Sequence, residues 1–90
     1  MIEKEHIVLW SRCLSVIRDN VPETIFKPWF EPIVPLIYQN KALTIGVPTQ
    51  FFYEILEEKY ADLLRVALNK EIGEGTQLVY RVLIDKTNEQ

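Results

Sequence analysis

The sequence contains very few of the residues that build cross-linked or metal-bound frameworks. Its 90 residues include one cysteine and one histidine. This excludes a disulfide framework and argues against a structural zinc site, which uses four such ligands. No apolar run approaches the roughly 18 residues that a membrane-spanning helix needs. The acidic start, MIEKE, is unlike a signal or transit peptide, and a lone thiol without an export signal predicts a reducing, cytoplasmic location.

An excess of positive charge is missing as well. Ten basic and thirteen acidic residues give a formal net charge of −3, which excludes the basic footprint of a tight, electrostatically driven nucleic-acid binder. The 48% hydrophobic and 26% charged residues are typical of a folded globular domain. The length favours one domain. We place it at residues 1–85, and 86–90, which lack apolar side chains, form a frayed end or the start of a linker.

The hydrophobic pattern predicts an α+β fold in the order ααββαβ. A three-stranded sheet would be covered by helices on this plan. Pro35 in the first β-rich run indicates an edge strand or a bulge, because proline cannot donate to the ladder. The predicted elements are helices over 3–20, 23–30 and 50–71, and strands over 33–38, 42–47 and 78–84.

The first predicted helix has more apolar surface than a single sheet covers. Its apolar side chains, among them Leu9, Trp10 and Cys13, span an arc of about 180°, whereas packing on one sheet needs a stripe of roughly 100°. Either the second helix covers the surplus, or part of it faces a partner protein. For Trp10 both interpretations stay open, since exposed tryptophans are favoured anchors at interfaces.

The long predicted helix carries one aromatic residue on the side opposite its core face. At about 100° per residue, Phe52 and Leu56 face the core, whereas Phe51 points toward the side of Glu58 and Asp62. Either the Phe51 ring tucks under the hairpin, or it is an exposed anchor for a protein partner.

No arrangement of side chains indicates catalysis. His6 and Cys13 are two helical turns apart, about 10 Å, which is too far for contact between a nucleophile and a base. The three glutamates within residues 54–58 surround Lys59 and are typical of a solvated face with local ion pairs. The sequence contains no P-loop, GxGxxG, GxSxG or HExxH motif. We therefore expect no enzyme, and no catalytic, metal or cofactor site.

Single-stranded nucleic acid remains an alternative ligand. The order ααββαβ is similar to that of KH domains, whose grip on RNA depends on a GxxG loop. This chain lacks that loop, and its basic residues are scattered. Trp29 and Tyr38 are candidates for stacking on bases. The alternative function is thus a KH-like domain with weak single-strand binding.

Four segments in the right order resemble the N-terminal domain of the bacterial chromosomal replication initiator family DnaA. They are LWSRCL at 9–14, FKPWFEPI at 26–33, LTIGVPTQFF at 43–52 and EEKY at 57–60. The second segment matches the family signature F-x-x-W-[FI]-x-P-[IL]. The resemblance covers residues 9 to 84, nearly the whole chain.

The resemblance implies a non-catalytic docking domain that precedes a flexible linker. Such a domain contacts the replicative helicase, regulators of initiation and other initiator copies, and in some members it binds single-stranded DNA weakly. ATP and duplex DNA would be bound by later modules that this chain does not contain.

The resemblance also assigns roles to particular residues. Trp10 and Leu9 match positions used in self-association, and Phe51 matches a phenylalanine that contacts the helicase and regulators. Better-studied members have an acidic residue that helps to hold the helicase at the position of Ile25. Glu23 is the nearby acidic residue that would take its place.

Overall fold

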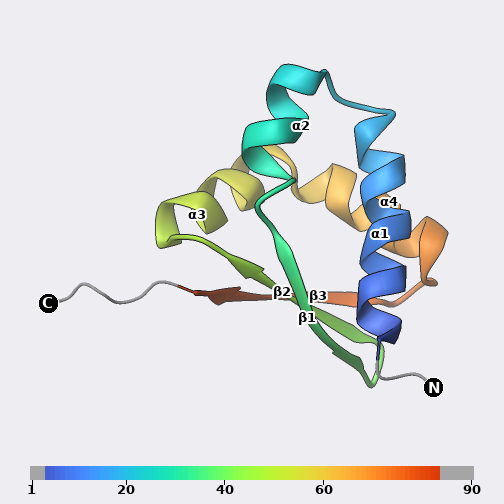
Figure 1. Ribbon diagram of the computed structural model, residues 1–90. Helices are drawn as coiled ribbons and strands as arrows, with labels where there is room; N and C mark the ends of the chain where they lie inside the picture. The colour runs from blue at the N-terminus through green and yellow to red at the C-terminus, as the bar shows by residue number, and fades with distance from the viewer. Residues whose placement is uncertain (1–3, 84–90) are drawn as a thin grey trace, which may run out of the picture.

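The fold is a three-stranded sheet with helices on one side, which confirms the predicted α+β class (Figure 1). The computed structural model describes residues 4–83. The predicted linker segment 86–90 lies outside this range, as does the last residue predicted for the third strand. The elements in chain order are α1 (Glu5–Arg18), α2 (Glu23–Trp29), β1 (Val34–Gln39), β2 (Ala42–Val47), α3 (Gln50–Lys59), α4 (Ala61–Glu71) and β3 (Gln77–Val82).

The single long helix predicted over 50–71 is wrong, because Tyr60 divides it into α3 and α4. Tyr60 leaves the helical conformation, with φ −126° and ψ 12°. It is both the C-cap of α3 and the N-cap of α4. The break places its ring edge-on against Phe30, with centroids 5.4 Å apart. The apolar period resumes on the same face after the break, so periodicity alone does not detect it. The observed order is ααββααβ.

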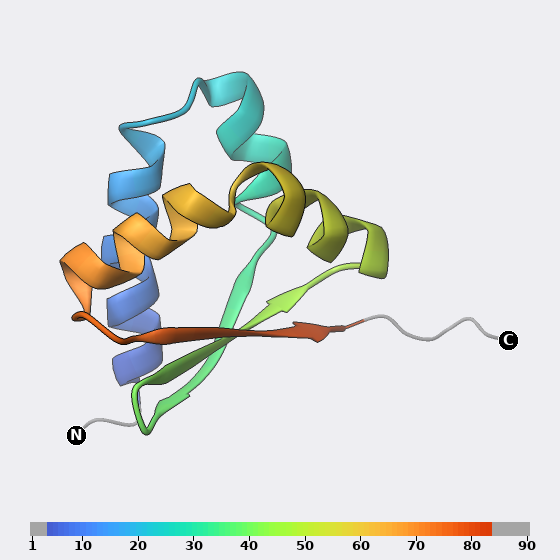
Figure 2. The same cartoon turned by 180° about the vertical axis from the view of Figure 1, so that it is seen from behind.

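The sheet combines an antiparallel and a parallel pair around a central β2. A two-residue turn at Asn40 and Lys41, both with positive φ, joins β1 to β2 as a tight hairpin. The predicted irregularity at Pro35 is confirmed, since the register shifts between Pro35 and Ile37 and β1 is an edge strand. β2 and β3 are parallel, so the chain must cross over, and α3 and α4 form that crossover. The helices α1, α2, α3 and α4 lie on the same side of the sheet (Figures 1 and 2).

The core lies between β2 and the helices. The alternate residues Leu43, Ile45 and Val47 of β2 are fully buried under the helical layer. α4 contacts α1 closely, and the thiol of Cys13 lies 3.7 Å from the carbonyl oxygen of Ala67. Among the described residues, no helix is both long and apolar enough to cross a membrane. The remaining buried apolar side chains are Trp10, Ile17, Phe26, Phe30, Ile33, Leu56, Leu64 and Leu68.

Trp10 belongs to this core, which decides between its two interpretations. Its side chain is only 2% exposed, and its indole Nε1 has no hydrogen-bond partner in the described part of the chain. The surplus apolar surface of α1 lies instead at Ile7 and Val8, which are half exposed. The interpretation of Trp10 as an exposed anchor is therefore wrong, because α1 turns this part of its wide apolar arc inward.

We predict that replacing Trp10 with alanine lowers the free energy of unfolding by roughly 3–5 kcal/mol, since a large buried side chain leaves a cavity. Trp10→Phe keeps an aromatic ring and removes the unpaired Nε1, so its loss should be clearly smaller. Chemical denaturation of the two variants measures both effects. A Trp10→Ala curve that overlays the wild type would contradict the buried placement.

Cys13 gives a second prediction, on pH. Burial, reinforced by the nearby charge of Glu71, raises the pKa of the thiol from 9.0 to about 12. The thiolate is therefore disfavoured in the folded state, and the stabilisation that Cys13 provides below pH 9 is lost as the pH rises toward 12. Relative to Cys13→Ser, the wild-type denaturation midpoint should fall over this range. At pH 8 a thiol reagent should react slowly with the native chain and quickly in denaturant, whereas fast native reaction would refute the burial.

Candidate functional site

Phe51 is the most exposed large apolar side chain of the described residues. It lies in the first turn of α3 and is 63% exposed. Thr49 fixes the start of that helix, because its hydroxyl oxygen accepts a hydrogen bond from the backbone N–H of Phe52 at 3.1 Å. Phe52 and Leu56 face the core, so Phe51, the residue before Phe52, points outward. The predicted exposure of Phe51 is confirmed, and the alternative of a ring tucked under the hairpin is wrong.

The Phe51 ring lies against a second aromatic residue from a different helix. Trp29, the last residue of α2, has its ring centroid 6.4 Å from that of Phe51 and 4.9 Å from that of Phe52. Trp29 is itself half-buried and packs on the core. The exposed ring therefore stands on a fixed aromatic base where α2 meets α3.

Acidic side chains border this aromatic pair on α3. Glu54 and Glu58 follow Phe51 by three and seven residues, so they lie on its side of the helix, and both are exposed. Gln50 Nε2 donates a hydrogen bond to Glu54 Oε2 at 3.5 Å. We call the surface formed by Trp29, Phe51, Glu54 and Glu58 the α2–α3 patch.

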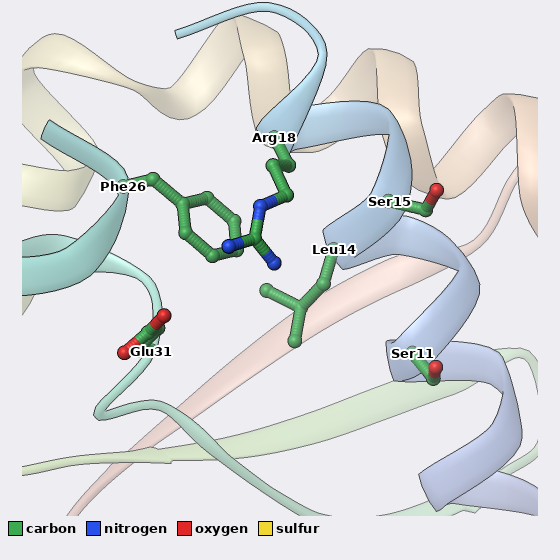
Figure 3. A pocket seen from close by; sticks show the side chains of 6 residues that line it. All are labelled: Ser11, Leu14, Ser15, Arg18, Phe26 and Glu31. Atoms are coloured by element: carbon green, nitrogen blue, oxygen red, sulfur yellow. The ribbon is translucent and has the colours of Figure 1, made fainter. Parts of the chain in front are cut away.

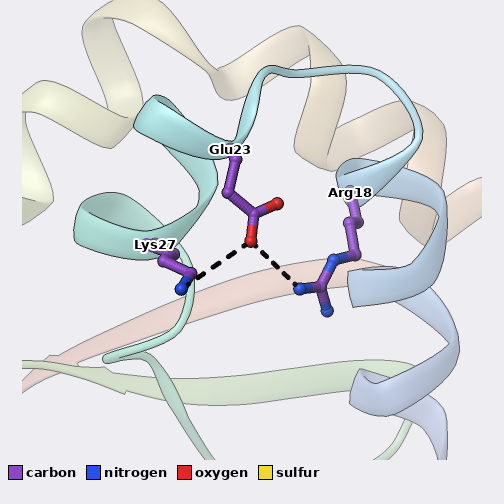
Figure 4. A network of polar contacts seen from close by, with 3 residues as sticks. All are labelled: Arg18, Glu23 and Lys27. Carbon is purple, nitrogen blue, oxygen red and sulfur yellow. Dashed lines mark hydrogen bonds and ion pairs between the residues drawn. The ribbon is translucent and has the colours of Figure 1, made fainter.

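Glu23 and Ile25 lie on opposite sides of α2. The Glu23 carboxylate faces α1 and lies 3.4 Å from Arg18 Nη2 and 3.9 Å from Lys27 Nζ (Figure 4). Ile25 is about 200° further round the helix, half-buried against the core. Four residues after Ile25 comes Trp29, so Ile25 shares the side of the α2–α3 patch. Glu23 therefore lies on a different side of α2 from position 25.

The other predicted site residues are spread over the molecule. Leu9 is half-buried on α1, next to the exposed Val8, and Trp10 enters the core. Trp29 ends α2, whereas Tyr38 lies near the hairpin at the far end of β1 and packs against the core. The structure thus brings together Trp29 and Phe51 but not Trp29 and Tyr38, and no continuous stacking platform links the last two.

A pocket that the sequence did not reveal opens between α1 and α2 (Figure 3). Its volume is about 380 Å³, and the guanidinium of Arg18 lies 4.7 Å from the centre of the Phe26 ring at its edge. The signal was present in the sequence as two serines four residues apart, whose small side chains leave room on one face of the first helix. The lining residues are Ser11, Leu14, Ser15, Arg18, Phe26 and Glu31.

The described residues do not gather the side chains that a metal site needs. Within residues 4–83, no three His, Cys, Asp or Glu side chains come close enough to share a metal ion. The Arg18 guanidinium in the pocket is already paired with Glu23. What distinguishes the described surface is the exposed aromatic ring with its acidic border.

Comparison with known proteins identifies the family. Residues 8–70 match the family model of the DnaA N-terminal domain. The chain is 64% identical over 88 residues to the chromosomal replication initiator protein DnaA of Bacteroides thetaiotaomicron, which covers 98% of this chain and 19% of that protein. It is 48% identical to that of Flavobacterium psychrophilum over 79 residues, 88% of this chain and 16% of the relative. The chain thus spans less than a fifth of these relatives, and it belongs to the family of DnaA N-terminal domains, which are parts of chromosomal replication initiator proteins.

Proposed function

We propose that this domain is a non-catalytic docking module of a replication initiator, which binds the replicative helicase and regulators of initiation through the α2–α3 patch. The observation that carries the proposal is the Phe51 ring, exposed on a rigid helix in a chain whose other phenylalanines are buried or half-buried. Such a ring is a favoured anchor when it enters a pocket on a partner.

The geometry of the patch suits an anchored contact. Burying a phenylalanine side chain contributes about 1.5–3 kcal/mol. Because Phe51 rests on Trp29 and stands on a capped helix, little conformational freedom is left to lose on binding. Glu54 and Glu58 at the border remain hydrated and orient the partner through charge. The matching partner surface is an apolar pocket with basic side chains at its rim.

The acidic part of the helicase contact comes from α3 rather than from α2. Position 25 is isoleucine, and the Glu23 carboxylate is paired with Arg18 of α1 and with Lys27 of α2 itself. Glu54 and Glu58 are exposed acidic side chains on the Phe51 side of α3. They provide the charge that the family places at position 25.

The domain also supports weak association between initiator copies. The exposed Ile7 and Val8, beside the half-buried Leu9, form an apolar strip on α1 that fits this role. Such contacts strengthen when several initiators gather on one origin, since each copy then raises the effective concentration of the next. Chemistry on ATP belongs to the parts of the parent protein outside this chain.

We predict that Phe51→Ala lowers the affinity of the chain for the cognate replicative helicase at least tenfold, because it removes the anchor. The free energy of unfolding should change by less than about 1 kcal/mol, since the ring is mostly exposed. Isothermal titration calorimetry measures the first quantity and chemical denaturation the second.

Val66→Ala is the matched control, because Val66 is 56% exposed on α4, outside the α2–α3 patch. It should leave helicase affinity unchanged. Equal affinities of wild type and Phe51→Ala would refute the assignment of the patch.

For single-stranded nucleic acid we predict only weak binding. Trp29 is packed on Phe52, and Tyr38 is half-buried at the other end of β1, so successive bases find no shared platform. Fluorescence anisotropy with a labelled oligonucleotide at several salt concentrations is the measurement. Micromolar or tighter binding with a steep salt dependence would instead support the KH-like alternative.

A further inference from the structure

The outer edge of β3 presents backbone groups without partners in the described structure. The backbone N–H groups of Gln77 and Leu83 donate to Lys41 and Val47 of the β2 side at 2.8 and 2.9 Å. In a parallel ladder, bonded residues alternate along the strand, so the odd-numbered residues face β2. The N–H and C=O groups of the even-numbered residues Leu78, Tyr80 and Val82 therefore point away from the sheet.

The two edges of the sheet differ in how they are protected. β1 carries Pro35 and a register shift, both of which hinder the addition of another strand, and α1 packs against it. β3 has six residues in unbroken register without Pro, Gly or Lys. No described segment pairs with its outer side (Figure 2). An edge of this kind is a template for strand addition.

We propose that β3 pairs with β3 of a second copy of this chain, antiparallel and around a two-fold axis at Tyr80, to form a continuous six-stranded sheet. A second copy is the partner because the outer edge of β3 is complementary to itself. Centred on Tyr80, the pairing places Leu78 opposite Val82 of the other copy and joins all three outward-facing residues in hydrogen-bonded pairs. The two copies thus satisfy each other's open edge with about six backbone hydrogen bonds.

Side chains favour this register over its neighbours. On the uncovered face of the sheet, Arg81 lies opposite Val79 of the other copy, and no like charges meet. A shift to an axis at Arg81 sets two arginines directly opposite each other, which is unfavourable. A shift to an axis at Val79 pairs Val82 with Thr76, beyond the end of the strand.

β3 is also packed against α3 and carries exposed apolar side chains. The Tyr80 ring packs edge-on against Tyr53, with centroids 4.8 Å apart. Val79 is 42% exposed and Val82 is 38% exposed, so pairing removes apolar surface from water. One strand pair buries less than the roughly 1,600 Å² of a standard stable interface, and the dimer is correspondingly weak. The inference rests on the part of the proposed function that concerns association between copies, and it is independent of helicase docking.

The test places a charge of either sign at Val79, opposite Arg81 of the other copy. Val79→Glu faces Arg81 of the other copy twice in each dimer, so it should tighten self-association by roughly two- to thirty-fold. Val79→Lys should weaken it by a similar factor, and the double change Val79→Lys with Arg81→Glu should restore it. Sedimentation equilibrium of the 90-residue chain over a range of concentrations gives the dissociation constants, and circular dichroism checks that each variant is folded.

Val8→Lys tests the competing contact through the α1 strip, because Val8 is half exposed in that strip and lies on α1, away from β3. Loss of association in Val8→Lys, together with no effect of the Val79 changes, would overturn the β3 pairing and leave association through α1 standing. Equal shifts for Val79→Glu and Val79→Lys would overturn the register. Absence of any association would overturn the pairing without bearing on Phe51.

Amide hydrogen exchange adds a signature that only edge pairing produces. On raising the concentration, protection should increase at Leu78, Tyr80 and Val82, whereas the odd-numbered residues are already bonded to β2 and should not change. A uniform change along β3, or none, would contradict the proposal.

Discussion

The parallel pairing of β2 with β3 is the constraint on which the rest of the structure depends. Strands that run in the same direction cannot be joined by a tight turn, so the chain must leave the sheet, cross one face and return. The crossover helices α3 and α4 lie on the same side of the sheet as α1 (Figures 1 and 2). One face of the sheet receives the helical layer, and no described helix covers the other face, where the Leu83 side chain lies against Gly46 (Figures 1 and 2).

The crossover also explains where the exposed aromatic ring stands. The chain leaves β2 at Val47 and begins α3 at Gln50, so the first turn of that helix lies beyond the end of the central strand. The inward face of this turn meets the sheet, and the next position round the helix meets only the end of α2. Trp29 comes from that helix, and its contact with Phe51 joins two segments that are separated along the chain by the hairpin.

Most of the helices and strands, and the exposure of Phe51, could be predicted from the sequence because they follow from local hydrophobic periodicity. Phe51 has Phe52 and Leu56 as neighbours that fix the inward side of its helix. Trp10 lies within an apolar arc of about 180°. A helical-wheel projection does not show which part of so wide an arc faces the core. The contact between Trp29 and Phe51 and the break at Tyr60 depend on how elements distant in the sequence meet, and the pairing of Glu23 with Arg18 depends on how the chain turns between α1 and α2. No local pattern encodes them.

The break at Tyr60 separates α3 from α4, and the two helices differ in how deeply they are buried. α4 anchors itself through Leu64, Ala67 and Leu68, whereas α3 contributes Leu56 as its one fully buried side chain among the described residues. Changes on the surface of α3 are therefore insulated from the packing that α4 maintains. Substitutions on the exposed face of α3 can therefore accumulate while α4 keeps the scaffold constant.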